Sequence, residues 1–106
     1  MFSPLDPLLH SQLRLAIMSL LISMEEADFL FLKEKTEASA GNLSVQIDQL
    51  QNAGYISVLK TYNGKKPQTI CKITAEGIRA FEAYIQVLQE YINVRVKSEE
   101  WRVKSE

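Results

Sequence analysis

One turn signal constrains the fold of this chain more than any other feature. The dipeptide Asn63-Gly64 lies between two segments, 55–62 and 68–73, that are rich in β-forming residues. Because both positions of such a dipeptide tolerate a positive φ, we predict a two-residue turn joining two antiparallel strands. Pro67 follows the turn and lacks a backbone N–H, which restricts the returning strand to a sheet edge or places Pro67 at its entry.

Helical patterns precede the hairpin. Residues 10–24 carry apolar side chains at helical spacing and predict a first helix, with Asp6-Pro7 before it as a cap and a first-turn proline. Asp28 is expected to cap a short second helix over residues 29–35. The acidic segment 25–28 is expected to be a solvated loop.

Two further helices are predicted. The third begins near Asn42, its expected N-cap, and ends before Gly54, which fits the glycine that follows a helix end. The last helix begins after Thr74, its expected N-cap, and Gly77 permits close packing there. It extends to at least Val94, a length of about 30 Å.

Two of the predicted helices are apolar on more than one face. The last helix carries a stripe at heptad-like spacing and a second stripe beside it, and the first helix also has two apolar faces. A helix of this kind is commonly buried once in its own core and once against a partner. We therefore predict a homodimer. The residues expected at its interface are Leu15, Met18, Ile22, Tyr84, Leu88 and Tyr91.

Charge is distributed unevenly along the chain. The formal net charge is only −1, so there is no bulk positive field that would indicate a nucleic-acid partner. Residues 60–79 nevertheless contain five basic residues, including Lys60, Lys65 and Lys66, against the single acidic Glu76. A local basic patch on a mildly acidic chain suits one DNA-facing surface better than general polyanion binding.

Several classes of protein are disfavoured. Cys71 is the single cysteine, which excludes an internal disulfide and suits a reducing cytosol. Neither a signal peptide nor a membrane-spanning run is visible, so we expect a cytoplasmic protein without membrane contact. His10 has no second ligand at metal-binding spacing, and no nucleophile–base pair is visible. We therefore expect that the protein is not an enzyme and that it binds no metal and no other cofactor. For Cys71 itself, a buried structural thiol is favoured over a redox sensor, which needs a lowered pKa and access.

The predicted order is helix, helix, tight turn, helix, hairpin, helix, which is that of a winged helix-turn-helix. The predicted fold is therefore mainly α with a β-hairpin wing (α+β) and a long C-terminal dimerisation helix. We expect residues 1–94 to form the winged helix with its two dimerisation helices. Residues 95–106 are expected to be a charged tail, in which the segment 95–99 recurs as 102–106.

Four motifs together indicate a family. They are the helix start Gly41-Asn42-Leu43-Ser44, the segment 53–56 that follows Leu50, the basic wing of residues 64–69, and the segment 73–77. With the opening Leu5-Asp6 and the stretch 14–17, they resemble the short winged helix-turn-helix regulators of bacteria and archaea related to the multiple-antibiotic-resistance regulator (MarR) family. The resemblance covers roughly residues 5–92. It implies a dimeric regulator of transcription that binds double-stranded DNA, with dimer contacts from the first and last helices.

The resemblance also implies which residues contact DNA. They lie on the exposed side of the third helix: Asn42, Ser44, Val45, Gln46 and Gln49. The basic segment itself adds Lys60, Lys65 and Lys66 as expected phosphate contacts. Asn and Gln can contact adenine edges bidentately, and lysines at a wing tip meet phosphates. Many relatives have a basic residue and a histidine near positions 45 and 46. Here Val45 offers contact to a thymine methyl instead, and Asp48 adds a negative charge.

Two functions stay open. A DNA-binding regulator would most simply act as a repressor that blocks polymerase. A winged helix that serves as a protein-interaction module is the alternative, favoured by the acidic overall balance and a third helix without basic residues. Salt-dependent DNA affinity separates the two. A cleft for a small-molecule effector, of unknown identity, is the alternative to simple packing around Tyr84 and Tyr91.

Overall fold

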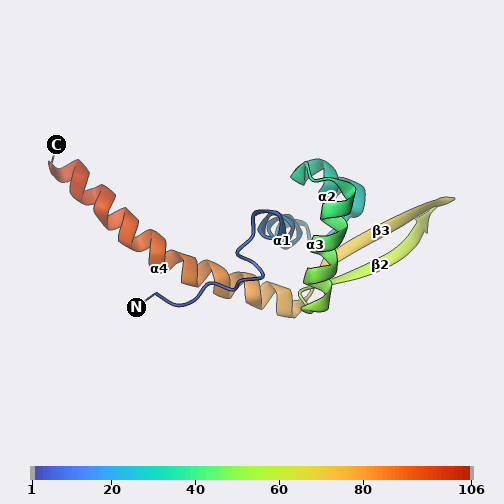
Figure 1. Cartoon of the computed structure of the whole chain (residues 1–106), viewed down its shortest axis with the longest axis horizontal. Coiled ribbons are helices and arrows are strands. Elements are labelled where there is room, and N and C mark those ends of the chain that lie inside the picture. Colours follow the sequence, from blue (N-terminus) through green and yellow to red (C-terminus); the bar gives the residue numbers. More distant parts are fainter. Residues whose placement is uncertain (1, 106) are drawn as a thin grey trace.

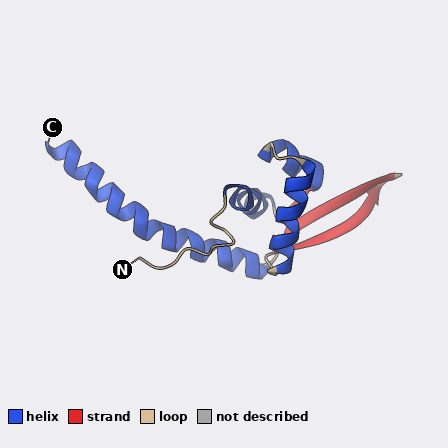
Figure 2. Ribbon diagram, viewed as in Figure 1, coloured by secondary structure: helices blue, strands red, loops and turns tan. Residues whose placement is uncertain are grey.

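The fold is a winged helix with a protruding last helix. The computed structural model describes the backbone of residues 2–105 and the side chains of residues 2–93. Figure 1 shows α4 extending to one side of the molecule and the β2–β3 hairpin to the other, and Figure 2 separates helices from strands. The predicted fold class, mainly α with a β-hairpin wing, is confirmed. The elements are α1 (Gln12–Met24), β1 (Glu26–Asp28), α2 (Phe29–Thr36), α3 (Ala40–Asn52), β2 (Ile56–Asn63), β3 (Lys66–Ile73) and α4 (Ala75–Ser105).

The sheet has a third strand that the sequence did not indicate. β1 pairs antiparallel with β3, in the order β1-β3-β2, and its residue Ala27 lies opposite Cys71. The expectation of a solvated loop over residues 25–28 was therefore wrong. Three residues are too few to show strand alternation, and only Ala27 among them is buried.

The hairpin turn lies one residue later than predicted. Asn63 still pairs with Lys66, so Gly64 and Lys65 form the two-residue loop. Gly64 alone among the turn residues has a positive φ, of 68°. Pro67 is accommodated although β3 is the central strand, because the pairing with β1 reaches only as far as Ile70. At Pro67, β3 has only β2 beside it.

Helix starts follow local capping chemistry. The backbone N–H of Phe31 donates to Oδ1 of Asp28 (2.8 Å), which confirms the predicted cap of α2. The N-cap of α3 is Ser39, whose Oγ accepts from the backbone N–H of Asn42 (3.2 Å), so the prediction of Asn42 as cap was wrong. The carboxylate of Asp6 caps a turn before α1 rather than α1 itself.

Two glycines allow α3, β2 and α4 to meet closely. Gly54 follows α3 with a φ of 81°, as the sequence predicted. A Cβ at Gly77 would lie 2.1 Å from the carbonyl oxygen of Tyr55, so the start of α4 accepts no side chain there. Thr74 caps α4 as predicted, since its hydroxyl accepts from the N–H of Gly77 (3.0 Å).

The core occupies the space between α1, α2, α3 and the sheet. α3 contributes Leu43, Ile47 and Leu50, spaced so that one side of the helix is buried. The opposite side of α3 is thereby left facing outward. The buried hydrophobic side chains are Leu9, Ile17, Met18, Leu21, Ala27, Leu32, Leu43, Ile47, Leu50, Ile56, Cys71, Ile73 and Tyr84.

Two of the residues predicted at a dimer interface belong to this core. Met18 is fully buried within its own chain, and Tyr84 is 4% exposed, with its hydroxyl 3.0 Å from Nδ1 of His10. Both side chains pack inside the protomer, and their place at a dimer interface stays a prediction. The other four, Leu15, Ile22, Leu88 and Tyr91, are half-buried.

α4 presents a second apolar stripe that the core leaves uncovered. Phe81 and Leu88 pack against the core, whereas Ile78, Ile85 and Ile92, seven residues apart, are 37%, 36% and 45% exposed. The backbone of α4 continues to Ser105. The side chains of the predicted tail, residues 95–106, lie outside the described residues, and its role stays a prediction.

Candidate nucleic-acid interface

The outward side of α3 carries the predicted contact residues. Asn42, Ser44, Val45 and Gln49 are exposed, and Gln46 is half-buried. Val45 is an exposed apolar side chain, with 51% of its surface accessible. An α-helix fits the major groove of B-DNA, and this side is free of the core. The exposed face therefore offers amides, one hydroxyl and one methyl-bearing side chain.

An arginine from another helix joins this face. Nη1 of Arg14, in α1, donates to Oε1 of Gln46 and to Oε1 of Gln49, the latter at 3.0 Å. Nε2 of Gln46 in turn donates to Oδ1 of Asn42 at 3.0 Å. Three predicted contact residues and Arg14 thus form one hydrogen-bonded cluster.

Arg14 was missed as a site residue, although a signal was present. It is the one charged residue in the otherwise apolar or neutral stretch of α1, Gln12–Met24. A single cation on a largely apolar helix indicates a specific polar partner. The sequence could not say that the partner would be α3, because that contact spans 32 and 35 positions along the chain.

The lysines of the wing lie in different places, some at its tip and one beside α3. Lys65 lies in the turn and Lys66 pairs with Asn63 beside it, so both stand exposed at the tip. Lys60 lies nearer the body, beside Ser44 and Asp48 of α3, where all three line one hollow. Lys72, opposite Ser57, lies at the other end of the strand. The basic segment therefore supplies two cations at the wing tip and one beside α3.

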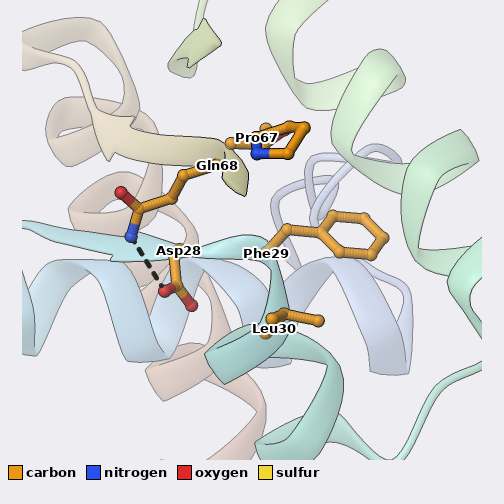
Figure 3. Close-up of a pocket in the computed structure, with 6 residues that line it drawn as sticks. Asp28, Phe29, Leu30, Pro67 and Gln68 are labelled. Atoms are coloured by element: carbon orange, nitrogen blue, oxygen red, sulfur yellow. Dashed lines mark hydrogen bonds between the residues drawn. The ribbon is translucent and has the colours of Figure 1, made fainter. Parts of the chain in front are cut away.

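A second hollow separates the wing from the start of α2 (Figure 3). Nε2 of Gln68 donates to Oδ2 of Asp28 across it (3.2 Å), and Phe29, Leu30 and Pro67 form its apolar part, as Figure 3 shows. Its volume is about 190 Å³. Typical small-molecule sites hold about 300 Å³ or more. The hydrogen bond ties the base of the wing to the α2 cap, and the hollow gives no support to an effector site here.

Cys71 has the environment of a structural thiol. Its side chain is fully buried in the core. Burial, assisted by the charge of Asp28, raises the pKa of the Cys71 thiol to about 11. A redox sensor needs the opposite shift and access to solvent. The environment therefore favours the structural role over the sensor.

Metal clusters and membrane-spanning helices are absent from the described residues. Within the described part of the chain, no three His, Cys, Asp or Glu side chains are grouped so as to hold a metal ion. Among those same residues, no helix combines the length and the apolar character needed to cross a bilayer.

Comparisons with known proteins identify the family. A family model described as a winged helix DNA-binding domain matches residues 13–92. An uncharacterised protein of Methanocaldococcus jannaschii is 35% identical over 86 residues, which cover 80% of this chain and 94% of that protein.

Solved structures show the same architecture. A transcriptional regulator homologue from Pyrococcus horikoshii matches with a TM-score of 0.76 at 26% identity, over 81% of this chain and 85% of that one. A mutant of MarR from E. coli in complex with operator DNA has a TM-score of 0.67 at 19% identity, over 94% of this chain and 83% of that one, a likeness of fold. The chain belongs to the winged helix DNA-binding domain family, and its fold is that of the MarR-like transcriptional regulators.

Proposed function

We propose that this protein is a dimeric regulator of transcription that binds duplex DNA and represses by occupying a promoter. The observation that carries the proposal is the joint presentation of the polar side of α3 and the Lys65-Lys66 wing tip by one winged helix. The helix has the width of the major groove, and cations at the tip meet the neighbouring backbone. The P. horikoshii regulator homologue and the operator-bound MarR support the same reading.

The exposed apolar surface of α4 supports the dimer. The Cα radius of gyration is 17.1 Å, whereas a compact domain of about 100 residues has about 13 Å. Ile78, Ile85 and Ile92 are exposed on α4, and the half-buried Leu15, Ile22, Leu88 and Tyr91 extend the apolar surface. A second copy that packs its own α1 and α4 against these residues would cover them. Two α3 helices would then enter successive major grooves, about 34 Å apart, on a pseudo-palindromic site.

The α3 sequence favours a second candidate. Asp48 is the one charged residue in Ala40–Asn52, so no side chain of this helix carries a positive charge that would attract phosphate. A winged helix of this kind could instead use exposed Val45 to contact a protein. Such a module would bind DNA weakly and without sequence preference.

A binding experiment separates the two candidates. Fluorescence anisotropy against a pool of promoter fragments from the source genome, at two salt concentrations, should give tight binding to a few fragments and steep weakening by salt. Gln46→Ala should change which fragments are preferred. If no fragment binds at low salt, the regulator proposal fails and the interaction module takes its place.

A further inference from the structure

The recognition side of α3 is held by a guanidinium that comes from α1. Arg14 is half-buried, and its Nη1 reaches the side-chain oxygens of both Gln46 and Gln49. We propose that Arg14 is a positioning residue that fixes the orientation of these two amides and thereby sets the base preference of the helix. The inference rests on the proposed DNA-binding function.

Arg14 is itself anchored on its inner side. Its Nε donates to the carbonyl oxygen of Leu8, in the turn before α1. The backbone N–H of Leu8 donates to Oδ1 of Asp6 (2.9 Å), which holds that carbonyl in place. The guanidinium plane is therefore fixed by the turn on one edge and donates from Nη1 to the two glutamines of α3. A planar fork with little freedom is suited to orient its acceptors.

The chemistry of the guanidinium decides which way the amides point. Arginine has only donors, so both glutamines must turn Oε1 toward it. The NH₂ of Gln46 then donates to Oδ1 of Asn42. Asn42 must consequently direct its own NH₂ away from Gln46. Along this side of α3, the amide oxygens of all three residues are engaged within the protein.

The consequence is a surface that offers donors. Gln49 and Asn42, both exposed, present NH₂ groups while their oxygens accept from within the chain. Bidentate contact to adenine needs the amide oxygen to accept from adenine N6 while the NH₂ donates to N7. Oε1 of Gln49 would then have to accept a second hydrogen bond beside the one from Arg14, whereas its NH₂ is free to donate. Donor groups alone match the acceptor edges, namely guanine O6 and N7 and thymine O4. The cluster therefore selects guanine over adenine at the position that Gln49 contacts, contrary to the adenine contact expected from the sequence.

The test compares base preferences of matched variants. Arg14→Lys keeps the charge but has one nitrogen in place of the Nε that bonds Leu8 and the Nη1 that bonds both glutamines, so it cannot hold the two amides in the same geometry. Arg79→Lys makes the same exchange at an exposed position on α4. Each protein selects sites from a library of randomised duplexes, and bound sites are sequenced. We expect the guanine-to-adenine ratio at one base pair of each half-site to fall about tenfold in Arg14→Lys, the size of one bidentate discrimination, and to stay unchanged in Arg79→Lys.

A second measurement does not depend on DNA. In ¹⁵N spectra of the free protein, the side-chain NH₂ signals of Gln46 and Gln49 should shift in Arg14→Lys, while those of exposed Gln86 stay in place. Gln49→Leu keeps Arg14 and should abolish the guanine preference at the same base pair, which covers the case in which Arg14→Lys does not fold.

The outcomes distinguish this inference from the function on which it rests. If the wild-type protein selects sites and Arg14→Lys selects the same sites with the same base ratios, the positioning role is refuted and DNA binding stands. If the wild-type protein selects no sites and binds no duplex at low salt, the proposed function fails, and the base-preference role fails with it.

Discussion

The phenol of Tyr55 donates a hydrogen bond of 2.6 Å to Oδ2 of Asp6, a residue 49 positions earlier in the chain. The carboxylate acceptor, with partial burial and the nearby charges, raises the pKa of Tyr55 to about 12. The contact fastens the turn before α1 to the loop after α3. Since the same turn holds the Leu8 carbonyl that anchors Arg14, the contact also supports the recognition side of α3.

Tyr55→Phe should lower the free energy of unfolding by about 1 kcal/mol, because it removes a charge-assisted hydrogen bond at a half-buried site. Urea denaturation of Tyr55→Phe, Asp6→Asn and the double variant measures the coupling between the two side chains. Tyr62→Phe, which changes a tyrosine that is 72% exposed, should leave stability within about 0.5 kcal/mol. Strictly additive effects of the two single substitutions would show that the contact contributes nothing.

Two glycine-to-alanine substitutions should have opposite effects. Gly77→Ala places a Cβ 2.1 Å from the Tyr55 carbonyl oxygen and should cost about 3 kcal/mol or more. Gly41→Ala meets nothing within 4 Å on an exposed part of α3 and should raise stability by about 1 kcal/mol. Thermal unfolding of both variants checks the pair. Equal melting temperatures would contradict the packing described at the start of α4.

Stability should fall in alkaline solution because of Cys71. Its pKa is raised from 9.0 to about 11 in the folded chain, so the neutral thiol stabilises the fold fully below pH 9. That contribution is lost as the pH rises from 9 through 11. The difference in unfolding free energy between the wild type and Cys71→Ala should therefore shrink over this pH range, by on the order of 2 kcal/mol. Other titrating groups, Tyr55 included, are common to both proteins. A pH-independent difference would show that the thiol does not titrate as described.

A charged side chain introduced into the exposed apolar stripe of α4 (Ile78, Ile85 and Ile92) tests whether the protein is a dimer. Light scattering at micromolar concentration should give twice 12.1 kDa for the wild type and 12.1 kDa for Ile85→Lys. Ile85 is already 36% exposed in the protomer, so its replacement should not unfold the chain. Ala83→Lys, two positions away on the opposite side of α4, is the control and should remain dimeric. A monomeric wild-type protein would refute the dimer.

Local signals made much of the fold predictable from the sequence. The caps Asp28 and Thr74 and the glycines Gly54 and Gly77 act through neighbours a few residues away, and each was confirmed. Distant packing was not predictable. The strand β1 exists only because β3 passes beside it, and Met18 and Tyr84 are removed from the surface by contacts that helix periodicity cannot reveal.

In the candidate site too, features set by neighbouring residues were predictable, and features set by distant contacts were not. The exposed side of α3 follows from its buried side, since Leu43, Ile47 and Leu50 fix which residues face outward. The orientation of the Gln46 and Gln49 side-chain amides could not be predicted in this way, because it depends on the guanidinium of Arg14, more than thirty positions away in the sequence.

The measurement that tests the central claim most directly is the salt dependence of DNA affinity for a variant of the wing tip. Lys65→Ala with Lys66→Ala removes four cations from a dimer, and the slope of log affinity against log salt should decrease by about 3 to 4. Lys33→Ala with Lys35→Ala, at exposed positions in the last turn of α2, removes the same charge and should leave the slope nearly unchanged. Equal slopes for the wing variant and the wild type would contradict the account, because the wing would then not lie on the phosphates.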